Sequence, residues 1–162
     1  MVHYEIRSVA QHELSACLAT LHAAFGESEK RFGYTKETYP SSGAYITLED
    51  LMSAKERGVH MYAAYVGDVV AGYVQLEKIK DGVYAFRRFA VLPEYQNLGL
   101  GKALIAHCRK RAAAIGARRI ELLMIYENTG LLAFYESNGF RLVRTGKDEK
   151  YPFEYAIMEM EI

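Results

Sequence analysis

The chain has 162 residues, a length typical of one compact domain, and we expect a single domain over residues 1–162. Apolar residues make up 51% of it and charged residues 25%, a balance that favours a buried core and argues against disorder. Twenty basic residues offset twenty acidic ones, so no overall positive field attracts nucleic acid or an anionic membrane surface.

The cysteines and the lengths of the uncharged stretches indicate the cellular compartment. The chain has only two cysteines, Cys17 and Cys108, which lie far apart in the sequence. Its first residues lack the apolar run of a signal peptide, and no uncharged stretch reaches the length of a transmembrane helix. These features predict a cytoplasmic protein without a membrane span.

The first predicted element is a short half-buried strand over residues 2–7, where apolar and polar residues alternate. Ser8 and Gln11 then have the spacing of a capping box, and apolar residues follow at helical intervals. This pattern predicts a helix over residues 9–25 that ends at Gly26.

A long irregular segment comes next. Residues 27–44 show no sustained period and are expected to be mainly loop with short helical pieces. Thr47 can cap a second, shorter helix that stops at Gly58.

The middle of the chain is rich in Val and Tyr. Tight-turn pairs at Gly67-Asp68 and Asp81-Gly82 divide it, which predicts strands over residues 59–66, 69–77 and 83–91. Strands joined by such short turns form an antiparallel meander.

The last third alternates between helices and strands. We expect a helix between Gly99 and Gly116, a strand at 119–125, a short helix at 129–137, and strands at 140–143 and 153–161. The predicted fold class is therefore α/β, with a mixed, largely antiparallel central sheet flanked by helices.

The segment from Phe89 to Lys102 carries the strongest chemical signal. A strand ends at Pro93, a loop with spaced glycines follows, and an amphipathic helix begins within that loop. Backbone N–H groups at a helix start have no intrahelical acceptor, and Gly99 and Gly101 have no side chain to keep a ligand away. This arrangement predicts a binding site for a phosphate or pyrophosphate.

Two nucleotide-binding motifs use the same physics but fit less well. A P-loop needs Gly and Ser or Thr at the positions of Gln96 and Ala103. A dinucleotide fingerprint needs a third Gly at the position of Leu104. A protein that binds ATP or NAD through this loop is the disfavoured alternative.

A wider pattern covers residues 86–140. It consists of a strand, Val91-x-Pro93-x-x-Gln96-x-x-Gly99-x-Gly101, a helix, Asn128, and Phe134-Tyr135-x-x-x-Gly139-Phe140. This pattern resembles the GNAT superfamily of acyl-CoA-dependent N-acyltransferases. The resemblance implies a GNAT-like fold and an N-acetyltransferase that moves the acetyl group of acetyl-CoA to a primary amine, by direct attack in a ternary complex.

The resemblance also implies the cofactor contacts. In that family, the loop holds the coenzyme A pyrophosphate through backbone amides, and the preceding strand pairs with the pantetheine arm. The strand is expected to splay from its parallel neighbour at residues 120–125, which leaves a cleft for the thioester. The cofactor-binding residues implied are Phe89, Ala90, Val91, Gln96, Asn97, Leu98, Gly99, Leu100, Gly101, Lys102 and Asn128.

Tyr135 is the catalytic residue that the resemblance implies. It lies two helical turns after Asn128, so both residues share a face of the short helix. The family uses the matching Tyr as an acid near the thioester sulfur, and a phenol with a reference pKa of about 10 stays protonated at neutral pH. Val91 is the expected backbone N–H donor to the attacked carbonyl oxygen. The alternative for Tyr135 is a packing role.

The chain departs from the family at the general base. Many members have a Glu where this chain has Ala85, and Glu77, Tyr84 and His60 are candidates because they lie on neighbouring predicted strands. The missing carboxylate supports a second hypothesis, a catalytically silent acyl-CoA-binding regulatory module on the same fold.

Other residues leave alternatives open. Arg87 and Arg88 alternate across a strand, so one of them faces the cleft and attracts a carboxylate, or both are solvated. The five histidines lack the spacing of metal ligands, so no metal is expected. Loop aromatics either line an acceptor pocket or cover the edge of the core; they are Phe32, Tyr34, Tyr39, Tyr45 and Tyr151.

The partner implied is a small-molecule or peptide amine. The family resemblance leaves a homodimer and a monomer both open, and the C-terminal residues 153–162 do not decide between them.

Overall fold

The computed structural model describes residues 2–162. Within these residues, seven strands form one sheet in the order β1-β2-β3-β4-β5-β7-β6, in which β4 and β5 are parallel and the other neighbours are antiparallel. The expected α/β class with a mixed, largely antiparallel sheet is therefore confirmed. The strands are β1 (Glu5–Ser8), β2 (His60–Val66), β3 (Val69–Lys80), β4 (Val83–Val91), β5 (Arg119–Ile125), β6 (Arg141–Gly146) and β7 (Tyr155–Glu161).

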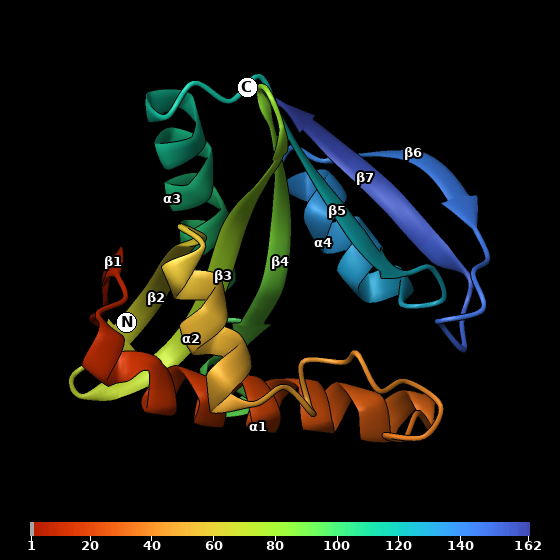
Figure 1. Ribbon diagram of the computed structural model, residues 1–162, viewed down its shortest axis with the longest axis horizontal. Helices are drawn as coiled ribbons and strands as arrows, with labels where there is room; N and C mark the ends of the chain where they lie inside the picture. The colour runs from red at the N-terminus through yellow and green to blue at the C-terminus, as the bar shows by residue number, and fades with distance from the viewer. Residues whose placement is uncertain (1) are drawn as a thin grey trace.

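Helices cover both faces of this sheet (Figure 1). They are α1 (Leu14–Phe32), α2 (Leu48–Glu56), α3 (Leu100–Ala114) and α4 (Thr129–Ser137). One buried core joins α1 and α2 to the sheet, and a second core joins α3 and α4 to its other face. Successive strand residues point to opposite faces, so Tyr73 belongs to the first core and Val74 to the second.

Most predicted elements agree with the observed ones. β5 and α4 have the predicted bounds, and Thr47 caps α2 by accepting a hydrogen bond from the backbone N–H of Asp50. The strand predicted at 140–143 is longer, because β6 stays paired with β7 as far as Gly146.

The first helix is longer than predicted. α1 continues through Gly26 to Phe32, and Gly33, with φ 77°, ends it in the left-handed conformation. The prediction that Gly26 ends the helix was wrong, and the segment predicted to be mainly loop from residue 27 instead begins with the last six residues of α1. Residues 27–31 contain Glu, Lys and Arg, which favour helix strongly enough to carry it past one glycine.

Gly26→Ala is expected to raise the free energy of unfolding by about 0.5–1 kcal/mol, because alanine is the better helix former. No neighbouring atom lies within 4 Å of the position that a Cβ at Gly26 would take. Urea denaturation measures the change. Gly33→Ala is the control, and its left-handed φ predicts a loss of stability instead. Destabilisation by Gly26→Ala would contradict the observed helix boundary.

Glu13, and not Ser8, holds the start of α1. The predicted capping box of Ser8 and Gln11 was wrong, because Ser8 belongs to β1 and a 3-10 turn at residues 11–13 precedes the helix. The Glu13 carboxylate accepts a hydrogen bond from the backbone N–H of Ala10 at 2.9 Å.

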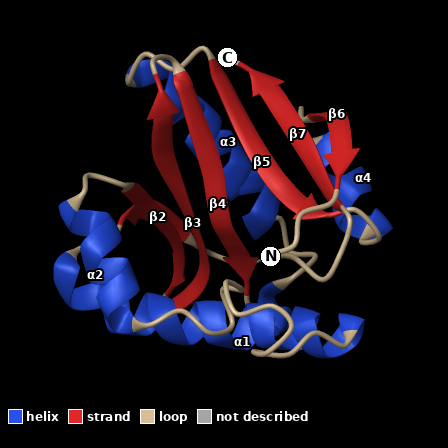
Figure 2. Ribbon diagram, turned by 45° about the vertical axis from the view of Figure 1, so that its right-hand side comes forward, coloured by secondary structure: helices blue, strands red, loops and turns tan. Residues whose placement is uncertain are grey.

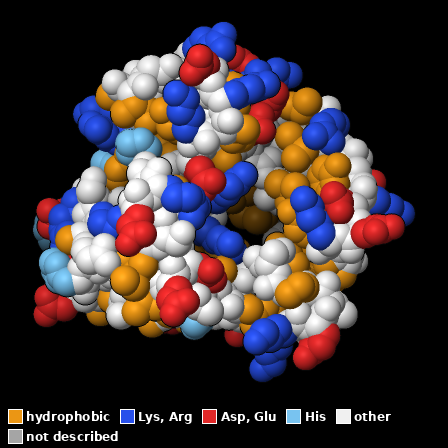
Figure 3. Space-filling model, in the orientation of Figure 1, with side chains coloured by type: hydrophobic (Ala, Val, Ile, Leu, Met, Phe, Trp, Pro, Cys, Tyr) orange, Lys and Arg blue, Asp and Glu red, His pale blue; other side chains and the backbone are white. Residues whose placement is uncertain are grey.

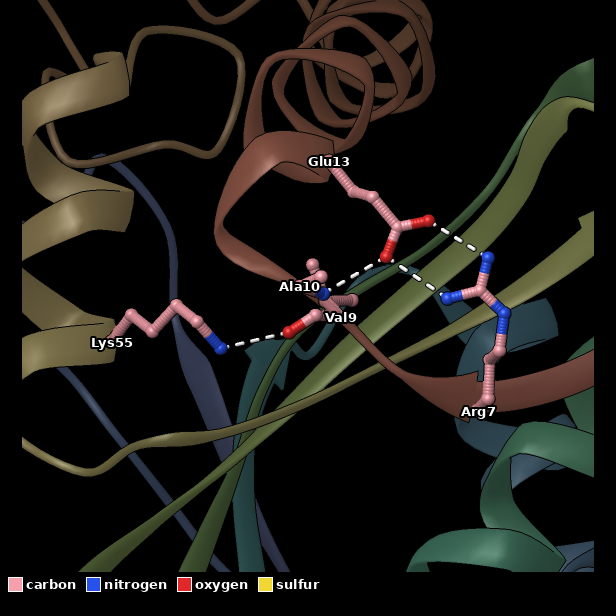
Figure 4. A network of polar contacts seen from close by, with 5 residues as sticks. All are labelled: Arg7, Val9, Ala10, Glu13 and Lys55. Carbon is pink, nitrogen blue, oxygen red and sulfur yellow. Dashed lines mark hydrogen bonds and ion pairs between the residues drawn. The ribbon is translucent and has the colours of Figure 1, made fainter.

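Two further contacts tie this junction to its surroundings (Figure 4). The Arg7 guanidinium donates to both Glu13 oxygens, at 2.9 and 2.8 Å, and Lys55 of α2 donates to the Val9 carbonyl at 2.8 Å. These contacts join β1, α1 and α2 at one corner of the fold.

Glu13→Gln is expected to lower the free energy of unfolding at pH 7 by about 0.5 kcal/mol, the size typical of a solvent-screened ion pair. Hydrogen bonding from Arg7 lowers the pKa of Glu13 from 4.5 to about 2. A lowered folded-state pKa means that the stabilisation exists above pH 4.5 and disappears as the pH falls towards 2. Urea denaturation at pH 7 and pH 3 therefore shows a smaller difference between the two proteins at pH 3. An equal difference at both pH values would contradict this role.

β4 and β5 separate along their length. They pair only at Val83 with Arg119, Tyr84 with Ile120 and Ala85 with Glu121. Beyond these pairs the two strands diverge towards the end of the molecule where α1 lies (Figure 2). The expected splay is confirmed, and the second half of β4 has an unpaired edge.

A bulge interrupts β4 in the splayed region. β3 pairs Gln75 with Arg87 and Tyr73 with Ala90, so two β4 residues stand opposite one β3 residue. Arg88, the first of the two, has φ 56°, an uncommon conformation for a residue other than glycine.

Candidate active site

A cavity of about 540 Å³ lies at the splayed half of β4, beside the start of α3. Segments from four parts of the chain line it: α1, the end of β4, the loop into α3, and the start of α4. The lining residues predicted from the sequence are Phe89, Ala90, Val91, Gln96, Asn97, Gly99, Gly101, Lys102 and Asn128. The structure therefore brings these residues together around one space.

The loop into α3 shapes one wall of this cavity. Asn97 and Gly99 have positive φ values of 62° and 90°, which turn the chain sharply from β4 into α3. Leu100, Gly101 and Lys102 begin the helix, where no preceding turn supplies acceptors for their N–H groups. The positive end of the helix dipole therefore meets the cavity, which suits a bound anion.

Two predicted cofactor residues do not line the cavity. Leu98 is exposed, and Leu100 is buried in the core beneath α3. Only the backbone of Leu100 is therefore suited to contact a ligand at the helix start.

Gln96 and Asn128 have structural contacts as well. The Gln96 side-chain amide donates to the Val91 carbonyl at 3.1 Å, which ties the loop to the end of β4. The Asn128 side-chain oxygen accepts from the Leu131 N–H at 3.2 Å and caps α4. Both side chains thus fix the positions of the elements that surround the cavity.

Sequence reasoning missed the contribution of α1. Ala24, Phe25, Glu27, Ser28 and Arg31 all line the cavity. They were overlooked because the helix was predicted to end at Gly26. The helix-favouring run of Glu, Lys and Arg after that glycine was the available signal.

Tyr135 lies next to this cavity in an aromatic cluster. Its ring centroid is 5.9 Å from that of Phe89 and 6.0 Å from that of Phe134, and both of these side chains line the cavity. The Tyr135 side chain itself is buried, and this burial raises the pKa of its phenol above the ordinary value. The phenol therefore keeps its proton well into the alkaline range.

The three base candidates lie in different surroundings. Glu77 pairs with Ala85 across β3 and β4 and lines a second cavity, whereas Tyr84 is buried in the core on the other face of the sheet. The His60 ring lies 6.2 Å from that of Tyr84. Of the three, Glu77 alone lines either cavity.

Both oxygens of Glu77 are already engaged. Arg87 lies 3.0 Å from one carboxylate oxygen and Arg57 lies 3.5 Å from the other. Glu77 is therefore part of an ion-pair cluster with Arg57 and Arg87.

The loop aromatics form a cluster, with one exception. Rings of Phe32, Tyr34, Tyr39 and Tyr151 follow one another at centroid distances of 5.9 to 6.3 Å. Tyr45 lies apart, in the wall of the second cavity. A third cavity of about 740 Å³ is lined in part by Tyr34 and Tyr151.

The cysteines lie outside these cavities. Cys17 and Cys108 are both buried, and burial raises the pKa of the Cys17 thiol to about 12. Within residues 2–162, no three His, Cys, Asp or Glu side chains gather as a metal site. In the same range, no helix has the length and apolar character needed to cross a membrane.

Solved structures with the same fold support the assignment of the architecture. The chain superposes on the ribosomal-protein-S18-alanine N-acetyltransferase of Escherichia coli with a TM-score of 0.79 and 19% identity, over 99% of this chain and 94% of that one. It superposes equally well (TM-score 0.79, 20% identity) on the PaiA N-acetyltransferase of Thermoplasma acidophilum in complex with coenzyme A, over 99% and 100% of the two chains.

Sequence comparisons identify the family. An uncharacterized N-acetyltransferase, YvbK, of Bacillus subtilis (strain 168) is 32% identical over 87 residues, or 54% of this chain and 56% of YvbK. The matched part thus spans about half the length of that curated relative. The model of the acetyltransferase (GNAT) family matches residues 21–140, which is most of the chain. The chain therefore belongs to the acetyltransferase (GNAT) family.

Proposed function

We propose that the chain is an enzyme that transfers the acetyl group of acetyl-CoA to a primary amine, by direct attack within a ternary complex. The cavity at the splay of β4 and β5 carries this proposal. It combines the start of a helix, which suits a pyrophosphate, with an unpaired strand edge, which suits the amide-containing pantetheine arm.

Backbone groups of the loop into α3 are assigned to the pyrophosphate. The N–H groups of Gly99, Gly101 and their neighbours donate to its oxygens, and Lys102 adds a positive charge in the same wall. Arg31, from the end of α1, is a second cation in the wall of this cavity.

Val91 is assigned as a hydrogen-bond donor to the thioester carbonyl. The next residue, Leu92, donates its N–H to Ala71 on the β3 side at 2.8 Å. Because N–H groups alternate along a strand, the Val91 N–H points to the open edge. A donor in that place stabilises the negative charge that develops on the carbonyl oxygen during attack.

The reaction forms one bond and breaks another. The neutral amine nitrogen attacks the thioester carbon, and the tetrahedral species that results expels the coenzyme A sulfur as the C–S bond breaks. The sulfur takes a proton from Tyr135, and the nitrogen releases one to solvent, from which Tyr135 is reprotonated. The products are an N-acetyl amine and coenzyme A thiol. The buried thiols of Cys17 and Cys108 favour this direct transfer over a covalent enzyme intermediate.

A thermal-shift titration with acetyl-CoA, coenzyme A, ATP and NAD tests the cofactor assignment. We expect stabilisation by the coenzyme A species alone, about 2.7 kcal/mol at 100 times the dissociation constant. Stabilisation by ATP or NAD instead would favour the nucleotide-binding alternative, and no stabilisation by any of the four would overturn the cofactor site.

Thiol release from acetyl-CoA in the presence of amines then separates the enzyme from the catalytically silent module. The enzyme releases coenzyme A thiol in proportion to the acetylated amine. The silent module binds acetyl-CoA and releases none.

A further inference from the structure

A second cavity, of about 340 Å³, lies between α2 and the strands β3 and β4. Figure 3 shows the face covered by α1 and α2, which is hollowed near its centre, with Lys and Arg side chains gathered on the α2 side of the hollow. The charged residues that line this cavity are Asp50, Arg57, Glu77, Arg87 and Arg88. We call this cavity between α2, β3 and β4 the arginine cavity.

The charges in the arginine cavity do not balance. The Glu77 carboxylate is shared by Arg57 and Arg87, as described above. Asp50 is engaged at the start of α2, where its carboxylate accepts from the Thr47 N–H at 2.8 Å. Three guanidinium groups therefore face two carboxylates, and one positive charge is left over.

Arg88 carries this unbalanced charge. Among residues 2–162, no carboxylate forms an ion pair with it, and its guanidinium donates to the Ser41 carbonyl at 3.1 Å. The side chain is partly buried, and this burial lowers the pKa of Arg88. The Asp50 carboxylate stabilises the Arg88 charge only at longer range. A partly buried guanidinium without a carboxylate at ion-pair distance is unfavourable, and a bound anion would reduce that cost.

The β4 bulge places Arg88 in this cavity. Strict alternation would put Arg87 and Arg88 on opposite faces of the sheet, as expected from the sequence. Both line the arginine cavity instead, because the backbone of Arg88 adopts φ 56° and breaks the alternation. An uncommon backbone conformation of this kind is often retained for a functional reason.

Consecutive residues of β4 line the arginine cavity and the cavity at the splay of β4 and β5, which we call the cofactor cavity. Arg88 lines the first, and the next three residues, Phe89, Ala90 and Val91, line the second. A small molecule bound at Arg88 is thus three residues along β4 from Val91, a span of about 10 Å of extended strand.

We infer that Arg88 binds a carboxylate of the acceptor, and that the acceptor is a small amine carrying a carboxylate, such as an amino acid. This inference rests on the proposed acetyl transfer. A planar guanidinium matches the two oxygens of a carboxylate. The same excess of positive charge disfavours polyamines, which bring several cations and no anion.

The first test measures thiol release from acetyl-CoA with the twenty proteinogenic amino acids, spermidine and O-phosphoethanolamine. We expect the highest kcat/KM for an amino acid, at least tenfold above that of the amine obtained by removing its carboxylate. A best acceptor without an anionic group would overturn the inference. So would a preference for O-phosphoethanolamine, because phosphate would then be the anion recognised.

The second test uses variants of Arg88. Arg88→Gln is expected to lower the preference for the amino acid over its decarboxylated amine by about 10- to 100-fold, the range of a hydrogen bond to a charged group. Arg88→Lys loses less, because it keeps the charge without the planar fork. Arg109→Gln is the matched control, since Arg109 is an exposed residue of α3 that lines neither cavity. An undiminished preference in Arg88→Gln would overturn the inference.

A binding experiment separates this inference from the proposed function. Each of the twenty amino acids is titrated calorimetrically into the protein saturated with coenzyme A, in the wild type and in Arg88→Gln. Binding that the substitution weakens supports the inference even where no thiol is released, an outcome in which the proposed transfer fails. Thiol release with amines that lack a carboxylate, together with no binding of any amino acid, overturns the inference and still supports the proposed acetyl transfer. The melting temperatures of both Arg88 variants report whether they are folded.

Discussion

Gly101→Val is expected to raise the dissociation constant for coenzyme A by about 100-fold or more. A Cβ at Gly101 would lie 3.2 Å from ring atoms of both Phe89 and Phe134, at the wall of the cofactor cavity. The two further methyl groups of valine would keep the pyrophosphate away from the start of α3. Loss of two hydrogen bonds to a charged group costs about 3 kcal/mol, which corresponds to a factor of more than 100.

Isothermal titration with coenzyme A measures this effect. Gly26→Val is the matched control, because Gly26 also lies inside a helix but has no neighbouring atom within 4 Å and does not line the cavity. We expect the control to bind coenzyme A as the wild type does. Wild-type affinity in Gly101→Val would contradict the assignment of the pyrophosphate to the start of α3.

Tyr135→Phe is expected to lower kcat by about 100-fold at neutral pH, the lower end of the usual contribution of a general acid. The substitution removes only the hydroxyl group. It keeps a ring within the aromatic cluster, where the centroids of Phe86, Phe89 and Phe140 lie 5.5 to 6.0 Å away. The melting temperature and the affinity for coenzyme A are therefore expected to stay close to those of the wild type.

The pH dependence gives a second readout. Burial raises the pKa of Tyr135, so the proton-bearing form of this acid persists above pH 10 in the folded enzyme. The wild-type kcat is therefore expected to show no loss of this acid up to pH 10. Steady-state rates between pH 7 and 10 measure both the loss of kcat in Tyr135→Phe and the pH dependence of the wild-type kcat. Tyr4→Phe is the control, because Tyr4 is an exposed tyrosine beside β1. A Tyr135→Phe enzyme with wild-type kcat would restrict Tyr135 to packing.

The sequence predicted the position of the glycine loop before α3 well because its signals are local. The two glycines, the end of β4 and the amphipathic α3 follow one another within a few residues, and each imposes its own backbone geometry. Nine of the predicted cofactor residues consequently line one cavity. Leu98 does not, because the direction of a side chain in a loop depends on dihedral angles that the sequence pattern does not specify. Leu100 does not, because it is the first residue of α3 and its side chain belongs to the apolar face that packs into the core.

The boundary of α1 shows where local signals fail. A glycine after an apolar helical run is a common helix end, yet Gly26 lies inside α1. The helix-favouring residues beyond it and the packing of α1 against the sheet outweigh the local cost of one glycine. Because of this error, the sequence did not predict that Arg31 and its neighbours on α1 line the cavity.

By itself, the sequence determined the order of the elements, the class of fold and the place of the glycine loop before α3, because periodicity, turns and glycines act within short stretches of chain. Only the tertiary structure decided which distant groups share a cavity. The bulge at Arg88 depends on how β3 pairs with β4. The second ion pair of Glu77 depends on Arg57, which directly follows α2 in the chain and packs beside β3. Such contacts join residues far apart in sequence, so their geometry is set by the packing of the whole sheet and not by any local pattern.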